Sequence, residues 1–377
     1  MTESVNRHCN GVKTILHLID TTGPGGAETV FIQLADLLRQ RGYRSLVVIH
    51  GPGWVHDELQ RRGLAPLVVA VTGGFAVGLL WQLLRLVRRE KVDVIQSHLL
   101  GSNVYAAMVG LLARVPVVAT YHGMVDINPR ERFRRIKHRA MKWGIRRYVT
   151  VSRRLLDSVC AQNLLDPDKT TVVYNGIETE KYRPNQSSRL RRQLQVADDA
   201  LLVGSLGNIR SAKAYDVLIE AAARVVPDYP NLHFIVAGHQ KEPLMSELNR
   251  QVVELGLADH IHFIGFYEDS ADFLGQLDYF VLCSSSEGFS ISTIEAMATG
   301  LPVLVTRCGG PEEIVSHGEN GWMVPPGDPA ALAQALAQLI ADAGLSHKLG
   351  AAGLAHVRNT FDVQAMLNGY EAIYTRL

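Results

Sequence analysis

Two glutamates in the stretch Cys283–Gly327 have the type and spacing to share one ligand. Glu287 precedes the run Ile291–Thr299, whose composition is helical, and Glu295 lies inside that run. Gly300 and the Leu-Pro pair after it end the predicted helix. Because ionised carboxylates only accept hydrogen bonds, two of them beside each other suit a ligand that carries several hydroxyl groups.

The start of the same predicted helix is suited to an anion. Gly288, Phe289 and Ser290 lie directly before it, and Ser290 is a candidate N-cap. Backbone N–H groups at a helix start favour phosphate and similar anions. Hydroxyl acceptors next to an anion site indicate a ligand that is both a sugar and a phosphate.

The motifs of this region resemble those of glycosyltransferase family 4. They are Glu287-x7-Glu295, then GLPV, the GG-x-E run from Gly309 to Glu312, and NGWMVPPGD. The resemblance implies the α/β GT-B fold, with two Rossmann-like doubly wound parallel-sheet domains facing a central cleft. It also implies retaining transfer of a sugar from a nucleotide-sugar donor.

Composition is that of an ordinary globular protein of two domains. The 377 residues exceed what one hydrophobic core usually holds, and 47% are hydrophobic against 20% charged. A net charge of +1 argues against a general nucleic-acid binder. The N-terminus lacks an apolar signal core, which favours the cytoplasm. The cysteines are far apart and form no CxxC pair, which favours reduced thiols and no zinc site: Cys9, Cys160, Cys283 and Cys308.

Short apolar runs alternate with helical patterns, which predicts parallel sheets whose ligands lie outside the carboxyl ends of the strands. The first half has a predicted helix at 27–41 and predicted strands at 15–19, 46–49, 67–71, 92–96, 117–120 and 148–151. The second half has predicted helices at 216–226 and 244–255 and predicted strands at 201–206, 233–237, 261–264, 279–282 and 303–305. The resemblance implies that residues 1–180 form the acceptor-binding domain and that residues 181–360 form the nucleotide-sugar-binding domain. Residues 361–377 are a helix that crosses back to the first domain.

Three candidate sites follow predicted strands of the first half. Gly25 and Gly26 belong to a GGAE turn after the first strand, while His98 and His122 follow the strands VDVIQ and VVATY. Each has an ordinary structural interpretation alone, as a tight turn or a hydrogen-bonded histidine, but together at one sheet edge they favour a function. The resemblance assigns the GGAE turn to the donor phosphates, both histidines to the sugar and acceptor, and a positioning role to His122. GPGGAE lacks the third glycine of a dinucleotide fingerprint, which disfavours a nicotinamide enzyme.

The second half supplies the predicted cation. Lys213, in GNIRSAK, occupies the position of the family's phosphate lysine. The family's usual arginine after the glycine is Asn208 here, and Arg210 could replace it as a catalytic and donor-binding group. By resemblance Glu287 accepts from the transferred sugar and Glu295 from the ribose. Since no metal motif is present, cations and helix starts must hold the diphosphate, and no cofactor is expected.

Two segments bear on membranes. Gly63–Leu84 is uncharged and long enough to cross a bilayer, but Pro66 and the Thr72–Gly74 turn break it, so a buried α/β element is expected. Residues 130–154 carry eleven Arg or Lys and one acid. Apolar side chains at Phe133, Ile136, Ala140 and Trp143 would form one stripe of a helix. This stripe fits either an anionic membrane surface or packing on its own domain.

Together with these observations, the resemblance implies a metal-independent, retaining hexosyltransferase with a UDP- or GDP-linked donor and a glycan or lipid-linked acceptor. We expect it to act in cell-surface polysaccharide biosynthesis, in the cytoplasm with peripheral contact to the inner membrane face. Two alternatives stay open. One is a nucleotide-sugar epimerase of similar fold. The other is a non-catalytic partner subunit at the membrane that binds a nucleotide-sugar. This alternative stays open because Asn208 stands where the family usually has an arginine.

Overall fold

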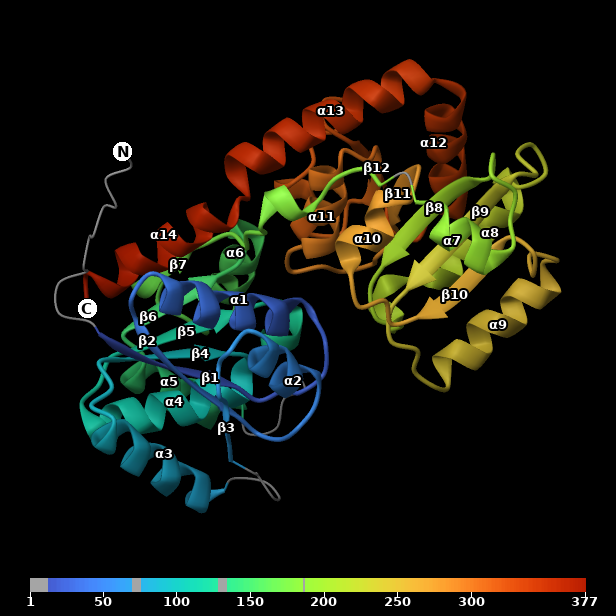
Figure 1. Ribbon diagram of the computed structural model, residues 1–377. Coiled ribbons are helices and arrows are strands. Elements are labelled where there is room, and N and C mark those ends of the chain that lie inside the picture. Colours follow the sequence, from blue (N-terminus) through green and yellow to red (C-terminus); the bar gives the residue numbers. More distant parts are fainter. Residues whose placement is uncertain (1–12, 70–75, 128–133, 186) are drawn as a thin grey trace, which may run out of the picture. The chain divides into compact units, whose positions relative to one another are not determined.

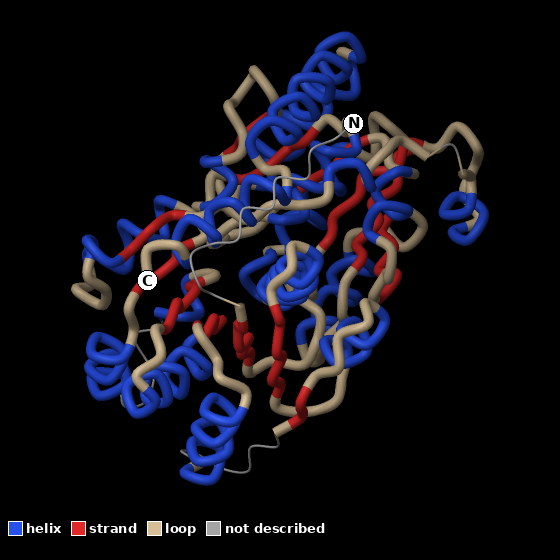
Figure 2. Tube along the Cα trace, turned by 60° about the vertical axis from the view of Figure 1, so that its left-hand side comes forward, coloured by secondary structure: helices blue, strands red, loops and turns tan. Residues whose placement is uncertain are grey.

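The computed structural model describes residues 13–69, 76–127, 134–185 and 187–377 (Figures 1 and 2). The chain forms two compact units, described separately below: unit 1 contains the residues up to Asn175 together with Gln364–Leu377, and unit 2 is Gly176–Val363. Each unit has one parallel β-sheet covered by helices, as the alternation of strands and helices in Figure 2 shows. The predicted α/β class with two parallel sheets is confirmed.

The sheet of unit 1 has the order β3-β2-β1-β4-β5-β6-β7, and its neighbouring strands are parallel. Its strands are β1 (Thr14–Ile19), β2 (Arg44–Ile49), β3 (Leu67–Val68), β4 (Val94–His98), β5 (Val117–Tyr121), β6 (Arg147–Thr150) and β7 (Thr170–Val172). The order reverses between β1 and β4, where Ile19 pairs with His98. Ligands of open α/β sheets bind outside the strand ends at such a reversal.

Helices cover both faces of this sheet. They are α1 (Gly26–Gln40), α2 (Trp54–Arg61), α3 (Val77–Arg89), α4 (Leu100–Ala113), α5 (Arg134–Gly144), α6 (Arg153–Ala161) and α14 (Val363–Tyr374). The connections β1→β2 and β4→β5 run in opposite directions along the sheet. Because such crossovers are right-handed, α1 and α2 lie on one face, and α3, α4 and α5 lie together on the other (Figure 1).

Unit 2 repeats this design with the strand order β10-β9-β8-β11-β12-β13. Its strands are β8 (Leu201–Leu206), β9 (Leu232–Ala237), β10 (Ile261–Gly265), β11 (Tyr279–Leu282), β12 (Val303–Thr306) and β13 (Trp322–Val324). Its helices are α7 (Arg189–Leu194), α8 (Tyr215–Val225), α9 (Leu244–Glu254), α10 (Ser270–Gly275), α11 (Ile291–Thr299), α12 (Pro329–Ala341) and α13 (Ala343–Thr360). The reversal of strand order falls between β8 and β11, so the loops after these two strands are the expected ligand loops.

Two predicted strands differ from the observed ones. The strand expected over residues 92–96 is β4, Val94–His98, because His98 still pairs with Ile19 and Thr120. His98 therefore ends the strand instead of following it. The strand expected over residues 67–71 is the short edge strand β3, paired with β2 alone, and its two residues are exposed. The expectation of a buried element at β3 was wrong.

The apolar run Gly63–Leu84 spans β3 and the beginning of α3, and its residues 70–75 lie outside the described residues. None of the helices in the described ranges is both long and apolar enough to cross a membrane.

Helix α14 is held to the sheet of unit 1 by a buried polar network. Tyr374 OH donates to Gln96 Oε1 at 3.0 Å, and Gln96 Nε2 donates to Thr120 Oγ1 at 2.9 Å. The Thr120 hydroxyl also lies 3.1 Å from Tyr370 OH. At the rim, Arg41 donates to Asn368 at 3.0 Å and also contacts Glu371. Side chains of α14 thus provide hydrogen-bond partners for the buried side chains of Gln96 on β4 and Thr120 on β5.

Tyr374→Phe should loosen β4 and β5. The change leaves the buried Gln96 Oε1 without its donor, and an unsatisfied buried acceptor costs about 1–3 kcal/mol. Native-state hydrogen exchange of the β4 and β5 amides should therefore become roughly 5- to 100-fold faster. Thr375→Ala removes an exposed hydroxyl from the turn directly after the helix, where it donates, among the described residues, only to carbonyls of α14, and should leave these rates unchanged. Equal exchange in the two variants would contradict the role given to the network.

Candidate functional site

The centre of the candidate site in unit 2 is an ion pair. Lys213 ends the short 3-10 helix η4 (Ser211–Lys213), and Glu287 lies on the loop after β11. Lys213 Nζ donates to Glu287 Oε1 at 2.7 Å, and Ser284 Oγ donates to the same oxygen at 2.7 Å. The two side chains are only 20% and 14% exposed. Among the described residues, Glu287 Oε2 has no hydrogen-bond partner and Lys213 Nζ has none besides Glu287, so both keep capacity for a ligand.

Glycines allow the segments around this pair to approach closely. A Cβ atom on Gly207 would lie 2.7 Å from Lys213 Cε. The Lys213 side chain therefore packs directly against the backbone of Gly207, just after β8. A Cβ atom on Gly310 would lie 2.5 Å from Phe289 Cα. Gly310 N also donates to Glu287 O at 3.0 Å. The Gly309-Gly310 turn therefore supports the loop that carries Glu287.

The start of α11 follows this loop. Ser290 is the N-cap, and its Oγ accepts from Thr293 N at 3.3 Å. The first N–H groups of a helix have no acceptor inside it, so those of α11 before Thr293 are suited to an anion. The candidate donor-binding residues Gly288, Phe289 and Ser290 therefore connect Glu287 directly to a helix start.

Glu295 lies apart from the ion pair, on the buried side of α11. Its Oε1 accepts from Tyr182 OH at 2.6 Å and from Ser270 Oγ at 3.3 Å. Burial raises the pKa of Glu295 to about 7, against the lowering effect of these two hydrogen bonds. Within the described part of the chain, no hydrogen bond joins Glu295 to Lys213 or Glu287. The structure thus brings Lys213 and Glu287 together and gives Glu295 a separate set of partners.

Asn208 and Arg210 have different environments. Asn208 Oδ1 accepts from His239 N at 3.1 Å and so fixes the turn after β9. Arg210 is exposed, and its carbonyl accepts from Lys213 N at 2.9 Å. Its guanidinium makes no hydrogen bond or ion pair with the residues that the structure describes. Asn208 therefore has a structural contact, whereas Arg210 keeps its charge available on the same loop.

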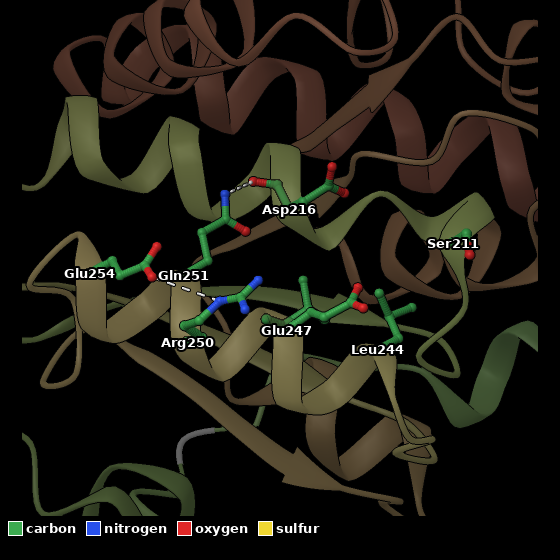
Figure 3. A pocket seen from close by; sticks show the side chains of 8 residues that line it. Ser211, Asp216, Leu244, Glu247, Arg250, Gln251 and Glu254 are labelled. Atoms are coloured by element: carbon green, nitrogen blue, oxygen red, sulfur yellow. Dashed lines mark hydrogen bonds and ion pairs between the residues drawn. The ribbon is translucent and has the colours of Figure 1, made fainter.

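A cavity of about 460 Å³ lies between the beginning of α8 and α9 (Figure 3). Its lining includes Ser211 of η4 but neither Lys213 nor Glu287. Gln251 Nε2 donates to Asp216 O at 3.2 Å across it, and Arg250 lies 3.7 Å from Glu254. The cavity is therefore a neighbour of the lysine loop and distinct from the ion pair.

In unit 1 the two candidate histidines contact each other. His98 Nδ1 lies 2.8 Å from His122 Nε2, and the rings stack with centroids 5.1 Å apart. Burial lowers the pKa of His122 to about 3 and that of His98 well below its usual value, with a further lowering of the latter by His122. Both rings are therefore neutral at physiological pH.

The neighbours of this pair define where the ring protons lie. With Gln96 oriented so that Tyr374 donates to its Oε1, the Gln96 amide nitrogen faces His98 Nε2 at 3.2 Å. His98 Nε2 is then the acceptor, and His98 Nδ1–H donates to His122 Nε2. The remaining proton of His122 is on Nδ1, which has no hydrogen-bond partner among the described residues. His122 can therefore donate a hydrogen bond to a ligand.

Two carboxylates that were not predicted from the sequence, the buried Asp126 and the partly buried Asp20, organise this edge. Asp126 accepts from Leu100 N at 3.0 Å, from His122 N at 2.7 Å and from Gly123 N at 3.3 Å. It therefore ties the histidine turn to the start of α4, which follows His98. Asp20, after β1, accepts from the backbone N–H groups of Gly101 and Ser102 at the same helix start. Nothing in the sequence pattern marked either aspartate, because both act through backbone contacts distant in sequence.

The GGAE turn lies next to the carboxyl end of β1. Gly25 is the N-cap of α1, and its carbonyl accepts from Thr29 N at 2.9 Å. A Cβ atom on Gly25 would lie 2.3 Å from Glu28 Oε2, because the Glu28 side chain folds back over the helix start. Gly26 is the first residue of α1. This turn is therefore at the same sheet edge as His98, which pairs with the last residue of β1.

No group of three or more His, Cys, Asp or Glu in the described ranges could hold a metal ion.

Asp126→Asn should change the pH response of the histidine turn. Burial raises the pKa of Asp126 to about 7. Protonation below this pH weakens its acceptance from His122 N and Gly123 N. In the wild type, the NMR shifts of these two amides should titrate with a midpoint near 7, and in Asp126→Asn this titration should disappear.

Asp20→Asn is the matched control for Asp126→Asn. It removes the other carboxylate at the start of α4, which does not contact the histidine turn. The amide titration should persist, with a lower midpoint because the negative charge of Asp20 raises the pKa of Asp126. Loss of the titration in Asp20→Asn would show that helix capping, and not the Asp126 contacts, controls the turn.

Glu295→Gln should remove a pH dependence of stability. The folded protein holds the Glu295 proton up to about pH 7, whereas the unfolded chain releases it near its usual pKa of 4.5. Stability therefore falls as the pH rises through this window, by on the order of 3 kcal/mol. The melting temperature of the variant relative to wild type should be higher at pH 8 than at pH 5. The exposed Glu319→Gln should show no such trend, and a flat difference for Glu295→Gln would contradict the raised pKa.

Two family models match the chain in succession. The model described as Glycosyltransferase Family 4 matches residues 24–181, and the model described as Glycosyl transferases group 1 matches residues 186–356. The two matched regions contain the candidate residues of unit 1 and of unit 2, respectively.

Curated relatives include two proteins of Rhizobium meliloti (strain 1021). The lipopolysaccharide core biosynthesis glycosyltransferase LpsE is 27% identical over 92% of this chain and 94% of its own length. The lipopolysaccharide core biosynthesis mannosyltransferase LpsB is 32% identical over 55% of this chain. That match covers 61% of LpsB, which is less than two thirds of its length.

Solved structures agree with the observed fold. Anabaena Alr3699/HepE, solved in complex with UDP and glucose, is 26% identical with a TM-score of 0.87, covering 97% of this chain and 100% of that one. WaaG, a glycosyltransferase involved in lipopolysaccharide biosynthesis, is 15% identical with a TM-score of 0.75 over 96% of this chain and 99% of its own, a likeness of fold alone. These neighbours have the GT-B fold. Motifs, fold and family models agree, and the chain belongs to glycosyltransferase family 4.

Proposed function

We propose that this glycosyltransferase moves a hexosyl unit from a UDP- or GDP-linked donor to a glycan or lipid-linked acceptor, in lipopolysaccharide core or similar cell-surface glycan biosynthesis. The Lys213–Glu287 pair carries the proposal, because it presents a cation and a hydroxyl acceptor side by side next to a helix start. The complexes of Anabaena HepE with UDP and UDP-glucose support a UDP-linked donor. The names of LpsE and LpsB support a role in the lipopolysaccharide core.

Lys213 is the catalytic cation in this proposal. Departure of the nucleotide diphosphate adds negative charge to its oxygens, and a preorganised ammonium stabilises that charge as it develops. Glu287 orients the ammonium through Oε1 and offers Oε2 to a hydroxyl of the transferred sugar. The start of α11 and Arg210 supply further positive potential. These groups support transfer without a metal ion, since the protein itself provides the charge at the diphosphate.

His122 acts as a hydrogen-bond donor and not as a nucleophile. Its Nε2 is occupied by His98 and its pKa is low, so Nδ1–H can hold a hydroxyl of the sugar or of the acceptor. Reaction on one face of the sugar, with the leaving phosphate oxygen taking the acceptor proton, retains the anomeric configuration and needs no protein nucleophile. His98 positions His122. Gly25 and Gly26 give the donor phosphates access to backbone at the start of α1.

Glu295 is proposed to accept from the ribose through Oε2. Its Oε1 is engaged by Tyr182. Burial raises the pKa of Glu295 to about 7, and a ligand hydroxyl that donates to Oε2 would favour the ionised carboxylate, because a hydrogen bond to the charged form stabilises it. Asn208 is occupied by His239 N, and this contact supports Arg210 as the residue that replaces the family's arginine.

We also propose a cytoplasmic location with contact to an anionic membrane surface through residues 130–154. In the described part of that stretch, Ile136 and Trp143 of α5 are each 69% exposed, while Met141 and Ile145 are buried. This exposure supports the membrane interpretation of the stripe over its packing on its own domain. Phe133 lies outside the described residues.

Lys213→Ala should lower turnover roughly 10- to 100-fold, because a charge-assisted hydrogen bond contributes about 1.5–3 kcal/mol. A melting screen against UDP- and GDP-sugars first identifies the donor, since a bound ligand raises the melting temperature. Turnover of that donor is then compared between Lys213→Ala and wild type.

Lys241→Ala is the control, because it removes an exposed ammonium from another loop of unit 2 and should leave turnover unchanged. Undiminished turnover in Lys213→Ala would sink the proposed mechanism. Release of free nucleotide without acceptor transfer would favour the epimerase or another reaction, and donor binding with no turnover at all would favour the non-catalytic partner subunit.

A further inference from the structure

Three neighbouring helices of unit 1, α3, α4 and α5, carry no acidic side chain. Helix α4 packs against both α3 and α5, and the three lie side by side on the same side of the sheet (Figure 1). Their sequences contain no Asp and no Glu. On the opposite face, α1 carries Glu28 and Asp36, and α2 carries Asp57 and Glu58. Acidic side chains are therefore absent from α3, α4 and α5 but present on α1 and α2.

The outward stripe of α3 is apolar in its first half and basic in its second. Val77 and Trp81 are 57% and 63% exposed, and Arg85 and Arg88 follow them at helical spacing on the same side. The inward side of α3 is buried, with Leu83 among its core residues. A tryptophan this exposed has most of its apolar ring in water, which is unusual for a surface without a partner.

Helices α4 and α5 continue this surface. Leu111 and Leu112 at the end of α4 are exposed, and Arg88 of α3 donates to the Leu112 carbonyl at 3.5 Å. On α5 the guanidinium of Arg139 lies 5.3 Å from the ring centre of the exposed Trp143. Each of the three helices therefore presents large apolar side chains, and α3 and α5 add basic ones beside them.

We propose that the outward sides of α3, α4 and α5 together dock unit 1 on an anionic lipid bilayer. This deepens the membrane contact proposed for residues 130–154, because it adds two helices outside that stretch, and it does not depend on glycosyl transfer. Tryptophan prefers the interface between headgroups and acyl chains, and aliphatic side chains insert beside it. Each Lys or Arg near an anionic surface strengthens binding about fivefold. The absence of acids on these helices removes the repulsion that would oppose this binding.

A lipid surface fits these side chains better than a nucleic acid does. Exposed Leu111, Leu112 and Ile136 have no stacking or hydrogen-bonding use against bases, whereas a bilayer buries them. The net charge of the chain, +1, gives no general attraction for polyanions, so the local basic face is needed.

The test is co-sedimentation of the full chain with vesicles. Vesicles of phosphatidylcholine alone are compared with vesicles of equal parts phosphatidylcholine and phosphatidylglycerol. We expect binding to the anionic vesicles only, weakened by added salt. Arg85→Gln should weaken it about fivefold, and Trp81→Ser and Trp143→Ser several-fold each. All three positions are exposed, so unchanged melting temperatures would show that the variants are folded.

Two controls match these changes. Arg61→Gln removes an exposed arginine from α2 on the opposite face, and Val253→Ser removes a 70% exposed apolar side chain from α9 of unit 2. Both should bind like the wild type, and that result supports the assigned face.

Equal binding to both kinds of vesicle, or to neither, overturns the proposal. So does wild-type binding of Trp81→Ser and Arg85→Gln while Trp143→Ser binds weakly, since the contact would then be limited to α5. Because sedimentation needs no donor or acceptor, failure of the proposed glycosyl transfer leaves this result unaffected.

Discussion

The Lys213–Glu287 ion pair is the interaction on which the candidate site of unit 2 depends. Its two charges are mostly buried, so each needs the other, and removing either would leave an uncompensated charge. The surrounding backbone is arranged to keep the two together. Ser285 N donates to Ala212 O at 2.8 Å, which fastens the glutamate loop to the lysine loop. Gly207 and Gly310 remove the side chains that would keep these segments apart.

In unit 1 the corresponding constraint is that the ionisable side chains packed together at the carboxyl end of the sheet must stay largely uncharged. Two histidines in contact are tolerated because burial keeps both uncharged. His17, on β1, is also fully buried, and burial lowers its pKa to about 3. The nearby Asp20 and Asp126 have their pKa values raised by the same burial. Burial therefore keeps the charge at this sheet edge low.

The sequence was sufficient for the features that follow from local pattern, namely the fold class and the positions of the candidate residues. The alternation of strands and helices predicted both sheets, and Lys213, Glu287 and Ser290 lie in motifs with fixed spacing. It was not sufficient where a role depends on contacts distant in sequence. Tyr182 reaches Glu295 across 113 positions, and no local pattern links them. The end of β4 was misplaced because His98 is polar, and its place in the strand comes from pairing with β1 and β5.

The polar network of α14 has a consequence for the order in which the two units can be completed during synthesis. Gln96 and Tyr374 are 278 positions apart, and Thr120 and Tyr370 are 250 apart. During synthesis β4 and β5 leave the ribosome long before these tyrosines exist. Translation proceeds at about 5–20 residues per second, so Tyr374 is synthesised on the order of tens of seconds after Gln96, and the Gln96 amide lacks this donor until then. The first unit to be translated is therefore completed only after the whole of unit 2 has emerged.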